Sequence, residues 1–217
     1  MRGAARFDRW HLGARALARA LLGQVLVRVD RSRRFSGRIV ETEAYLGAMD
    51  LGSHTAGGRR TPRTESMYRA GGHTYVYFVY GMHHCLNVVA APEGVGCAVL
   101  IRAIEPLEGF DQSTGAPRRC AGPARLCRAL LIDRSFDGED LRTSRRLFIE
   151  RGRAVAPARI VVGPRIGIDS AGAWRDAPLR FGVAGSQALS RPFPEKFSAS
   201  GGSAAGAKSW SSRRWPA

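Results

Sequence analysis

Residues 74–104 read TYVYFVYGMHHCLNVVAAPEGVGCAVLIRAI, and this stretch decides the fold. It holds three runs rich in β-branched and aromatic residues, Thr74–Tyr80, Cys85–Ala91 and Ala98–Ile104, as is typical of strands. The connections between the runs are short, which favours antiparallel pairing of consecutive strands. The sequence therefore predicts three neighbouring strands of one antiparallel sheet.

The segments on either side predict the rest of a mixed domain. Helical spacing of apolar residues predicts helices over residues 12–22, with Gly23 as the stop, and over residues 122–131. Further strands are expected at Gln24–Val29, Gly37–Tyr45, Arg159–Val162 and Leu179–Val183. The predicted fold class is α+β, a single domain with a mostly antiparallel twisted sheet and flanking helices.

The chain of 217 residues is long enough for one hydrophobic core, and we expect a domain over residues 1–197. Residues 198–217 read SASGGSAAGAKSWSSRRWPA and are predicted to be a disordered tail. No window approaches the roughly 18 apolar residues of a spanning helix, and the N-terminus carries no apolar signal core. A soluble cytoplasmic protein without a membrane partner is expected, associated with the nucleoid if the source is bacterial.

The charge balance favours a polyanion as partner. The formal net charge is +16, from 34 basic and 18 acidic residues, and nearly all the basic residues are Arg. An arginine-rich composition throughout the chain would give the same excess, so charge alone supports nucleic-acid binding only weakly. Lys196 and Lys208 are the only lysines, which disfavours chemistry through a lysine Schiff base. The four cysteines form no C-x-x-C pair and are expected to be reduced and buried.

The strand Gly37–Tyr45 carries an unusual polar face. Its period of two places Glu41, Glu43 and Tyr45 on the same side. One interpretation is a general base in a cleft with an aromatic wall beside it. The other is a solvated strand face, which the pattern alone favours.

Aromatic residues of the next strand have two possible roles. Tyr75 and Tyr77 share one face, and such residues pack in a core more often than they bind a ligand. Tyr80 comes just before Gly81 and Met82 at the strand end, where a phenol could wedge into a base stack.

Three further features could belong to a binding site. His54 lies in a Gly- and Arg-rich loop whose Arg59, Arg60 and Arg63 could grip phosphates, or could be an ordinary basic surface. Asn87, in an apolar strand, needs hydrogen-bond partners and could read a base edge or tie the fold together. Arg102, also in an apolar strand, is expected to pair with a carboxylate, either Glu43 or Glu105.

These motifs, taken together and in order, resemble a known family. IVETEAYLG, SHTAGGRRTPR, YVYFVYGMHHCLNVV and AVLIRAIEPLEG are similar to segments of the alkyladenine (3-methyladenine) DNA glycosylases, and the resemblance runs from about residue 21 to residue 190. It implies that Glu43 is the general base, and that Arg102 and a backbone carbonyl, that of Ile166, hold the nucleophilic water. It also implies a base slot and a pair of DNA-intercalating residues, Tyr80 and Met82. The slot would be formed by Tyr45, His54 and Tyr77, with Asn87 opposing the exocyclic amine of guanine.

The function implied is base excision repair. The protein would flip alkylated or deaminated purines from duplex DNA and hydrolyse the N-glycosidic bond to leave an abasic site, with no lyase activity, cofactor or metal. Its partner would be double-stranded DNA containing damaged purines, and a monomer is expected. Two alternatives remain: a non-catalytic nucleic-acid binder similar to the RNA-binding accessory domain of formyltransferases, and a metal-dependent nuclease, disfavoured because no acidic cluster accompanies His54.

Overall fold

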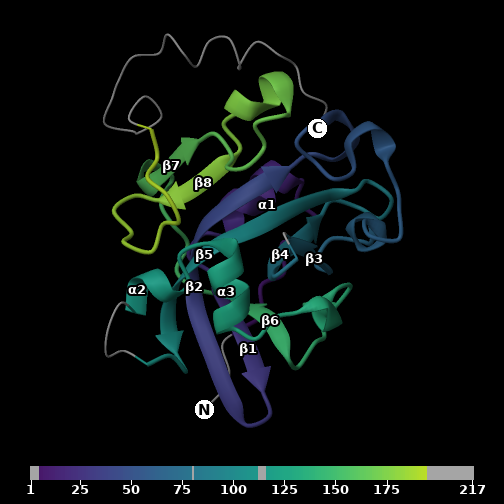
Figure 1. The fold of residues 1–217 in the computed structure, drawn as a ribbon. Helices are drawn as coiled ribbons and strands as arrows, with labels where there is room; N and C mark the ends of the chain where they lie inside the picture. The colour runs from purple at the N-terminus through teal and green to yellow at the C-terminus, as the bar shows by residue number, and fades with distance from the viewer. Residues whose placement is uncertain (1–4, 80, 112–115, 195–217) are drawn as a thin grey trace.

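The chain folds around a curled antiparallel sheet (Figure 1). The computed structural model describes residues 5–79, 81–111 and 116–194, so the expected tail over 198–217 and Tyr80 lie outside the described residues. Within those ranges the sheet has eight strands, in the order β3-β4-β5-β2-β1-β6, with β8 pairing with both β2 and β7. The strands are β1 Val25–Asp30, β2 Arg33–Tyr45, β3 Thr74–Val79, β4 His83–Ala90, β5 Cys97–Glu108, β6 Leu147–Glu150, β7 Ile160–Gly163 and β8 Arg180–Val183.

Strand β2 is the centre of the sheet. Its first half pairs with β1, its second half pairs with β8 through residues 41–43, and β5 follows its opposite edge. The register against β5 shifts at Ile39, Glu41 and Thr42, and such bulges bend a strand locally. The bend coincides with the change of partner from β1 to β8, so the polar ETE segment lies at the place where the sheet curls.

Helices pack on the sheet in two places. Helix α1, Ala14–Leu21, packs against β2 and β5, and α3, Pro123–Ala129, packs against β4 and β5; in Figure 1 they lie on opposite sides of the sheet, with α3 in front. A short helix α2, Ala116–Arg119, precedes α3. Helix α1 ends before Gly23, whose φ of +85° is a conformation that suits glycine.

The faces of β4 and β5 differ in chemistry. Leu86 and Val88 of β4 pack in the main hydrophobic core with Val99 and Ile101 of β5. The alternate residues, which include Asn87 and Arg102, face the opposite side of the sheet, as the period of two requires. This second face carries the polar and aromatic groups of the candidate site.

The predicted fold class is confirmed, and so are the two main helices and seven of the strands within the described ranges. The antiparallel pairing of β3, β4 and β5 is also confirmed. Two strands were predicted too short. Strand β2 begins at Arg33, because its ladder with β1 continues to a tight turn, and β5 continues to Glu108. Strand β6 was not predicted, because four residues give too short an alternation to recognise.

We predict that Leu17→Ala lowers the free energy of unfolding by about 2–5 kcal/mol, because Leu17 of α1 is fully buried against the sheet and its truncation leaves a cavity. Urea denaturation followed by circular dichroism measures the change. Ala16→Ser, at an exposed position of the same helix, is the control and should change it by no more than about 0.5 kcal/mol. Equal effects of the two substitutions would contradict the role given to α1.

Candidate functional site

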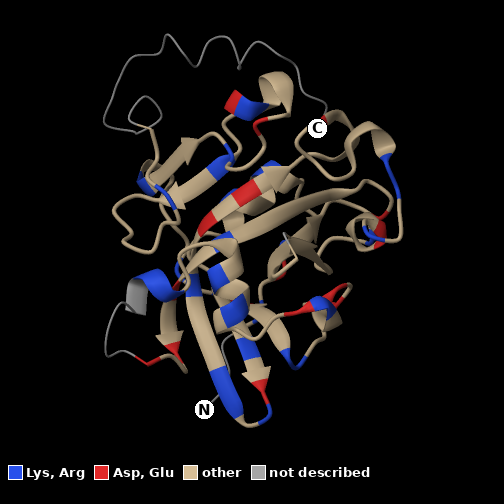
Figure 2. Ribbon diagram, in the orientation of Figure 1, with Lys and Arg blue, Asp and Glu red and all other residues tan. Residues whose placement is uncertain are grey.

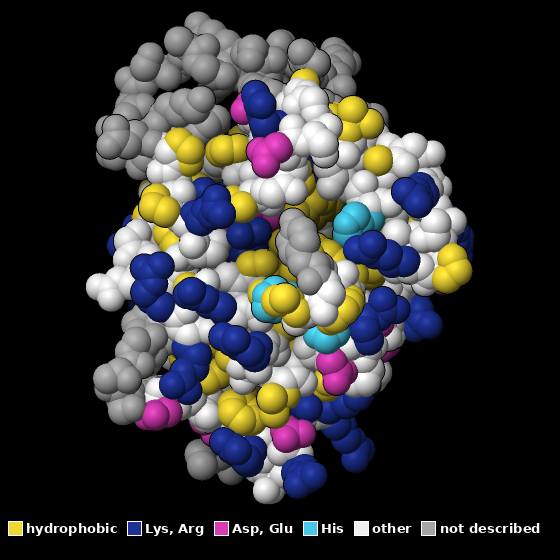
Figure 3. Space-filling view, in the orientation of Figure 1, with side chains coloured by type: hydrophobic (Ala, Val, Ile, Leu, Met, Phe, Trp, Pro, Cys, Tyr) yellow, Lys and Arg dark blue, Asp and Glu magenta, His cyan; other side chains and the backbone are white. Residues whose placement is uncertain are grey.

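A cavity of about 730 Å³ opens on the polar face of the sheet. Figure 3 shows hydrophobic and histidine side chains gathered near the middle of this face, with basic side chains to either side. Elements far apart in the sequence contribute its walls. Six of the residues predicted for catalysis or base binding line it: Tyr45, His54, Tyr77, Asn87, Arg102 and Ile166.

One wall of the cavity is a cluster of three rings. Tyr75 and Tyr77 are stacked, with ring centroids 5.2 Å apart, and His54 packs edge-on against Tyr77 at 4.6 Å. His54 Nδ1 and the Tyr75 hydroxyl are hydrogen-bonded at 2.8 Å. Tyr75 is almost fully buried and lines the cavity together with the other two rings. Sequence reasoning grouped Tyr75 with Tyr77 but gave it no role.

The surroundings of His54 favour its neutral form. Partial burial lowers the pKa of His54, and the positive charges of Arg63 and Arg59 lower it further. The ring therefore stays uncharged at neutral pH. A neutral imidazole adds an aromatic surface to the cavity without adding another positive charge.

Tyr45 forms a second aromatic surface. Its hydroxyl donates a hydrogen bond to Glu43 Oε2 at 3.0 Å, and the guanidinium of Arg165 lies 4.7 Å from its ring centroid. Burial raises the pKa of Tyr45 well above its ordinary value, and the negative charge of Glu43 raises it further. The phenol therefore remains protonated and acts as a donor to the carboxylate.

Glu43 lies directly behind this wall and is fully buried, so the solvated strand face favoured by the pattern is wrong. Besides the Tyr45 hydroxyl, it accepts a hydrogen bond from the Ile166 N–H at 2.8 Å and pairs with Arg102 Nη1 at 3.3 Å. The resemblance had implied the carbonyl of Ile166. The structure gives the N–H of that residue a contact with Glu43, and the part played by the carbonyl stays a prediction.

Arg102 joins the two glutamates of β2. Its Nε lies 3.1 Å from Glu41 Oε1, and its Nη1 makes the contact with Glu43. Burial alone would lower the pKa of Arg102, but the charges of Glu43 and Glu41 outweigh that effect and raise it. Of the two partners predicted for Arg102, Glu43 is confirmed and Glu105 is wrong, because Glu105 binds Arg38 and Ser186 instead.

Further buried charges support the site, and sequence reasoning missed them. Arg165 makes a two-pronged ion pair with Asp50, with Nη2 2.7 Å from Oδ1, and donates to the Ala44 carbonyl. Asp50 also accepts hydrogen bonds from the backbone of the loop that leads to His54. Arg180 donates to Glu41 at 3.1 Å. The rule that predicted a carboxylate for Arg102 would have found Arg180 as well, since it too lies in an apolar strand.

The remaining predicted residues differ in their placement. The Nδ2 of Asn87 donates to the Tyr75 carbonyl at 3.0 Å, which fixes the amide at the cavity wall. Met82 is 69% exposed, and its predicted partner in intercalation, Tyr80, lies outside the described residues. Arg63 lines the cavity with its guanidinium 5.6 Å from the Tyr77 ring centroid, whereas Arg60 is paired with Glu65 at the surface.

Within the part of the chain that the structure describes, no group of three or more His, Cys, Asp or Glu side chains is placed to hold a metal ion. No helix among the described residues is both long and apolar enough to cross a bilayer. The four cysteines are free and buried, as expected.

One family model and three known proteins that are similar to this chain carry the names of methylpurine or 3-methyladenine DNA glycosylases. A model of the methylpurine-DNA glycosylase family matches residues 9–187. The DNA-3-methyladenine glycosylase of Mus musculus is 47% identical over 188 residues, which are 78% of this chain and 56% of the mouse protein. The human DNA-3-methyladenine glycosylase is 46% identical over 188 residues, 78% of this chain and 62% of the human protein. A putative 3-methyladenine DNA glycosylase of Myxococcus xanthus is 47% identical over 181 residues, 83% of this chain and 90% of that protein.

The chain thus spans less than two thirds of the two mammalian relatives and nearly all of the bacterial one. The match covers the strands and loops that carry the buried carboxylates and the aromatic cavity. It confirms the resemblance to the alkyladenine glycosylases and gives no support to the formyltransferase-like RNA binder. The chain belongs to the methylpurine-DNA glycosylase family.

Proposed function

We propose that this protein removes alkylated or deaminated purines from duplex DNA by hydrolysing the N-glycosidic bond, with Glu43 as general base. The observation that supports it most directly is the position of Glu43, a fully buried carboxylate one hydrogen bond behind a cavity lined by Tyr45, Tyr77 and His54. A flat-sided, partly apolar cavity suits an everted base, and a carboxylate beside it suits the activation of water.

The base must leave the stack before it can enter the cavity. Extrusion costs a few kcal/mol, and the cost is lower for a damaged or mismatched base, which contributes to selectivity. Tyr80 would fill the gap in the duplex with Met82 beside it, and Met82 is well exposed for that role. Arg59, Arg60 and Arg63 would bind phosphates, which makes the affinity for DNA strongly dependent on salt.

Stacking and burial would hold the base more than charge does. A cationic base over an aromatic ring gains about 0.5–2 kcal/mol from the ring quadrupole. Here guanidiniums already lie over two of the rings, Arg165 over Tyr45 and Arg63 over Tyr77, which weakens the attraction for a further cation. Such a slot accepts neutral lesions, such as hypoxanthine, together with cationic ones, such as 3-methyladenine.

Bond cleavage would proceed through an oxocarbenium-like sugar. The electron pair of the C1′–N bond leaves with the base, a water oxygen bonds to C1′, and Glu43 takes a proton from that water. A carboxylate has about four acceptor positions, and the contacts with Tyr45, Ile166 and Arg102 occupy three of them. Because Glu43 is fully buried, the water reaches the remaining position only after the Tyr45 wall moves, which entry of the nucleotide would bring about.

The first test is release of free bases from defined duplexes. The wild-type protein should release 3-methyladenine or hypoxanthine, and Glu43→Gln should lower the single-turnover rate by at least about a thousandfold, because the amide can neither take a proton nor stabilise the sugar cation. Binding to the lesion duplex should change by less than about fivefold, as measured by fluorescence anisotropy, because the variant keeps the shape of the cavity. A wild-type rate in the variant would exclude Glu43 as the base.

We predict that the DNA strand stays intact at the abasic product. Strand cleavage by β-elimination needs an amine that forms a Schiff base with the sugar, and no lysine precedes Lys196. Reaction products should therefore be cut only after alkali, and borohydride should trap no covalent protein–DNA adduct. A lyase-active glycosylase on the same duplex serves as the positive control. A trapped adduct with this protein would contradict the monofunctional mechanism.

The amide of Asn87 is expected to exclude undamaged guanine. It is tethered to the Tyr75 carbonyl and lines the cavity, where it would meet the exocyclic amine of guanine. Asn87→Ala should raise the release of guanine from undamaged DNA by about tenfold or more relative to hypoxanthine release. The substitution removes the side-chain amide that would meet the exocyclic amine of guanine. Chromatography of released bases measures the ratio. An unchanged ratio would show that guanine is rejected elsewhere.

A further inference from the structure

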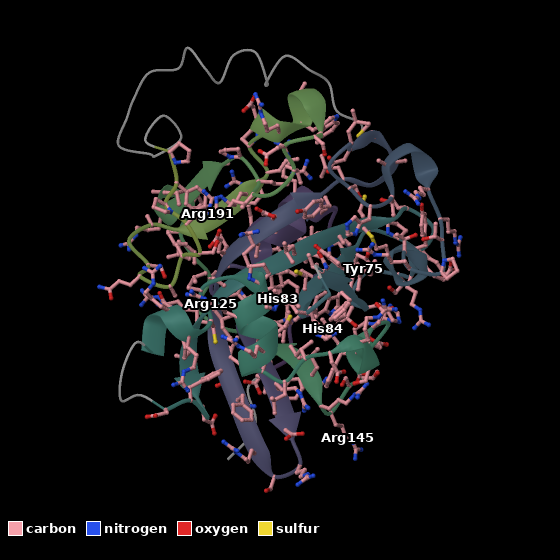
Figure 4. All side chains as sticks on the ribbon, in the orientation of Figure 1. Tyr75, His83, His84, Arg125, Arg145 and Arg191 are labelled. Carbon is pink, nitrogen blue, oxygen red and sulfur yellow. The ribbon has the colours of Figure 1, made fainter. Side chains whose placement is uncertain are left out.

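The segment after β8 returns to the site beyond the end of the family match. Residues 186–194, here called the strap, follow residue 183 at the end of β8, and the family model matches only as far as residue 187. Ala188 of the strap is fully buried in the main core. Arg191 lines the cavity and is labelled in Figure 4, on the side of this face away from Tyr75.

Ser190 is the residue of the strap that contacts the buried charges. Its N–H donates to Glu41 Oε2 at 2.6 Å and its hydroxyl donates to Glu41 Oε1 at 2.8 Å. The same hydroxyl accepts hydrogen bonds from Arg102 Nε at 3.3 Å and Nη2 at 3.2 Å. Ser190 thus bridges Glu41 and Arg102 on the side of the guanidinium away from Glu43.

Arg180 holds the strap against β8 through hydrogen bonds and a stacking contact. Its guanidinium donates to the carbonyls of Arg191 and Pro192, and it stacks 3.8 Å from the ring centroid of Phe193. Phe193 in turn rests on the backbone of β8, since a Cβ added at Gly182 would lie 2.6 Å from its ring. The strap is therefore seated independently of the Ser190 hydroxyl, and loss of that hydroxyl alone leaves these contacts in place.

We propose that Ser190 is a positioning residue of the glycosylase reaction, which holds the Arg102 guanidinium in the orientation that contacts Glu43. This inference rests on the proposed function. Three nitrogens of the Arg102 guanidinium are accounted for: Nη1 meets Glu43, Nε meets Glu41 and Ser190, and Nη2 meets Ser190. Without the hydroxyl, Nη2 loses the acceptor named here, and the planar group is oriented only by its contacts with Glu41 and Glu43, which leaves its position against the carboxylate that activates water less well defined.

Ser190→Ala in the full chain tests the proposal. The single-turnover rate of hypoxanthine release should fall about five- to twentyfold, because small misplacements of a group that orients the reacting water are costly. Affinity for the lesion duplex and the melting temperature should stay close to wild-type, since the strap remains seated. Ser190→Thr keeps a hydroxyl and should restore most of the rate. This pattern, a loss in rate without a loss in binding, is not expected from general loosening of the fold.

Ser186→Ala is the matched control. Ser186 lies in the same strap and its hydroxyl also donates to a glutamate, but that glutamate is Glu105, which is paired with Arg38. The single-turnover rate of Ser186→Ala should stay within about twofold of the wild-type rate. The proposal is overturned if Ser190→Ala keeps the wild-type rate, if Ser186→Ala slows the reaction equally, or if binding falls as far as the rate. If the wild-type protein itself releases no base, the proposed function fails instead, so the two failures are distinguishable.

Discussion

Three carboxylates with no exposed surface determine how this molecule is assembled. Glu41, Glu43 and Asp50 are completely buried, and an unpaired charge in such a place costs several kcal/mol. Each one has a buried guanidinium within ion-pair distance, from a set of three: Arg102, Arg165 and Arg180. Three negative and three positive side chains lie in this buried layer, so their formal charges cancel. A carboxylate whose charge is balanced and whose geometry is fixed is suited to act as a general base.

The same pairs also hold the walls of the cavity together. Glu41 connects β2 to Arg102 of β5 and Arg180 of β8, and Asp50 connects the loop before His54 to the segment 164–166. That segment supplies the Ile166 N–H to Glu43 and places Arg165 against the Tyr45 ring. Two groups of ion pairs, one of Glu41, Glu43, Arg102 and Arg180 and one of Asp50 and Arg165, therefore hold the curled sheet together and orient the groups that face the cavity. Removing Asp50 or Arg165 would leave its partner without the ion pair and would loosen a wall of the cavity at the same time.

Sequence periodicity could predict the site in part. Alternation along β2 placed Glu41, Glu43 and Tyr45 on one side, and the general rule for a buried arginine named Glu43 as one of two candidate partners of Arg102. The pattern could not tell that this polar face is covered, because the covering segment around Ile166 lies more than a hundred residues away and has no periodicity of its own. The ion pair of Asp50 and Arg165 joins two such irregular segments, so no local pattern could indicate it. The family resemblance supplied roles for residues but gave no sign of this supporting layer.

The distribution of charge separates binding from chemistry. The six residues of the buried network contribute no net charge, since three negative and three positive side chains cancel, so the whole excess of +16 lies elsewhere in the chain. Figure 2 shows basic residues spread over most elements rather than concentrated at the site. Long-range attraction to phosphates is screened by salt, whereas the contacts of a buried, neutral network are hardly affected by it. Salt should therefore act on the encounter with DNA and leave the step at Glu43 nearly unchanged, which is how a strongly basic surface and a precisely held carboxylate can coexist in one small domain.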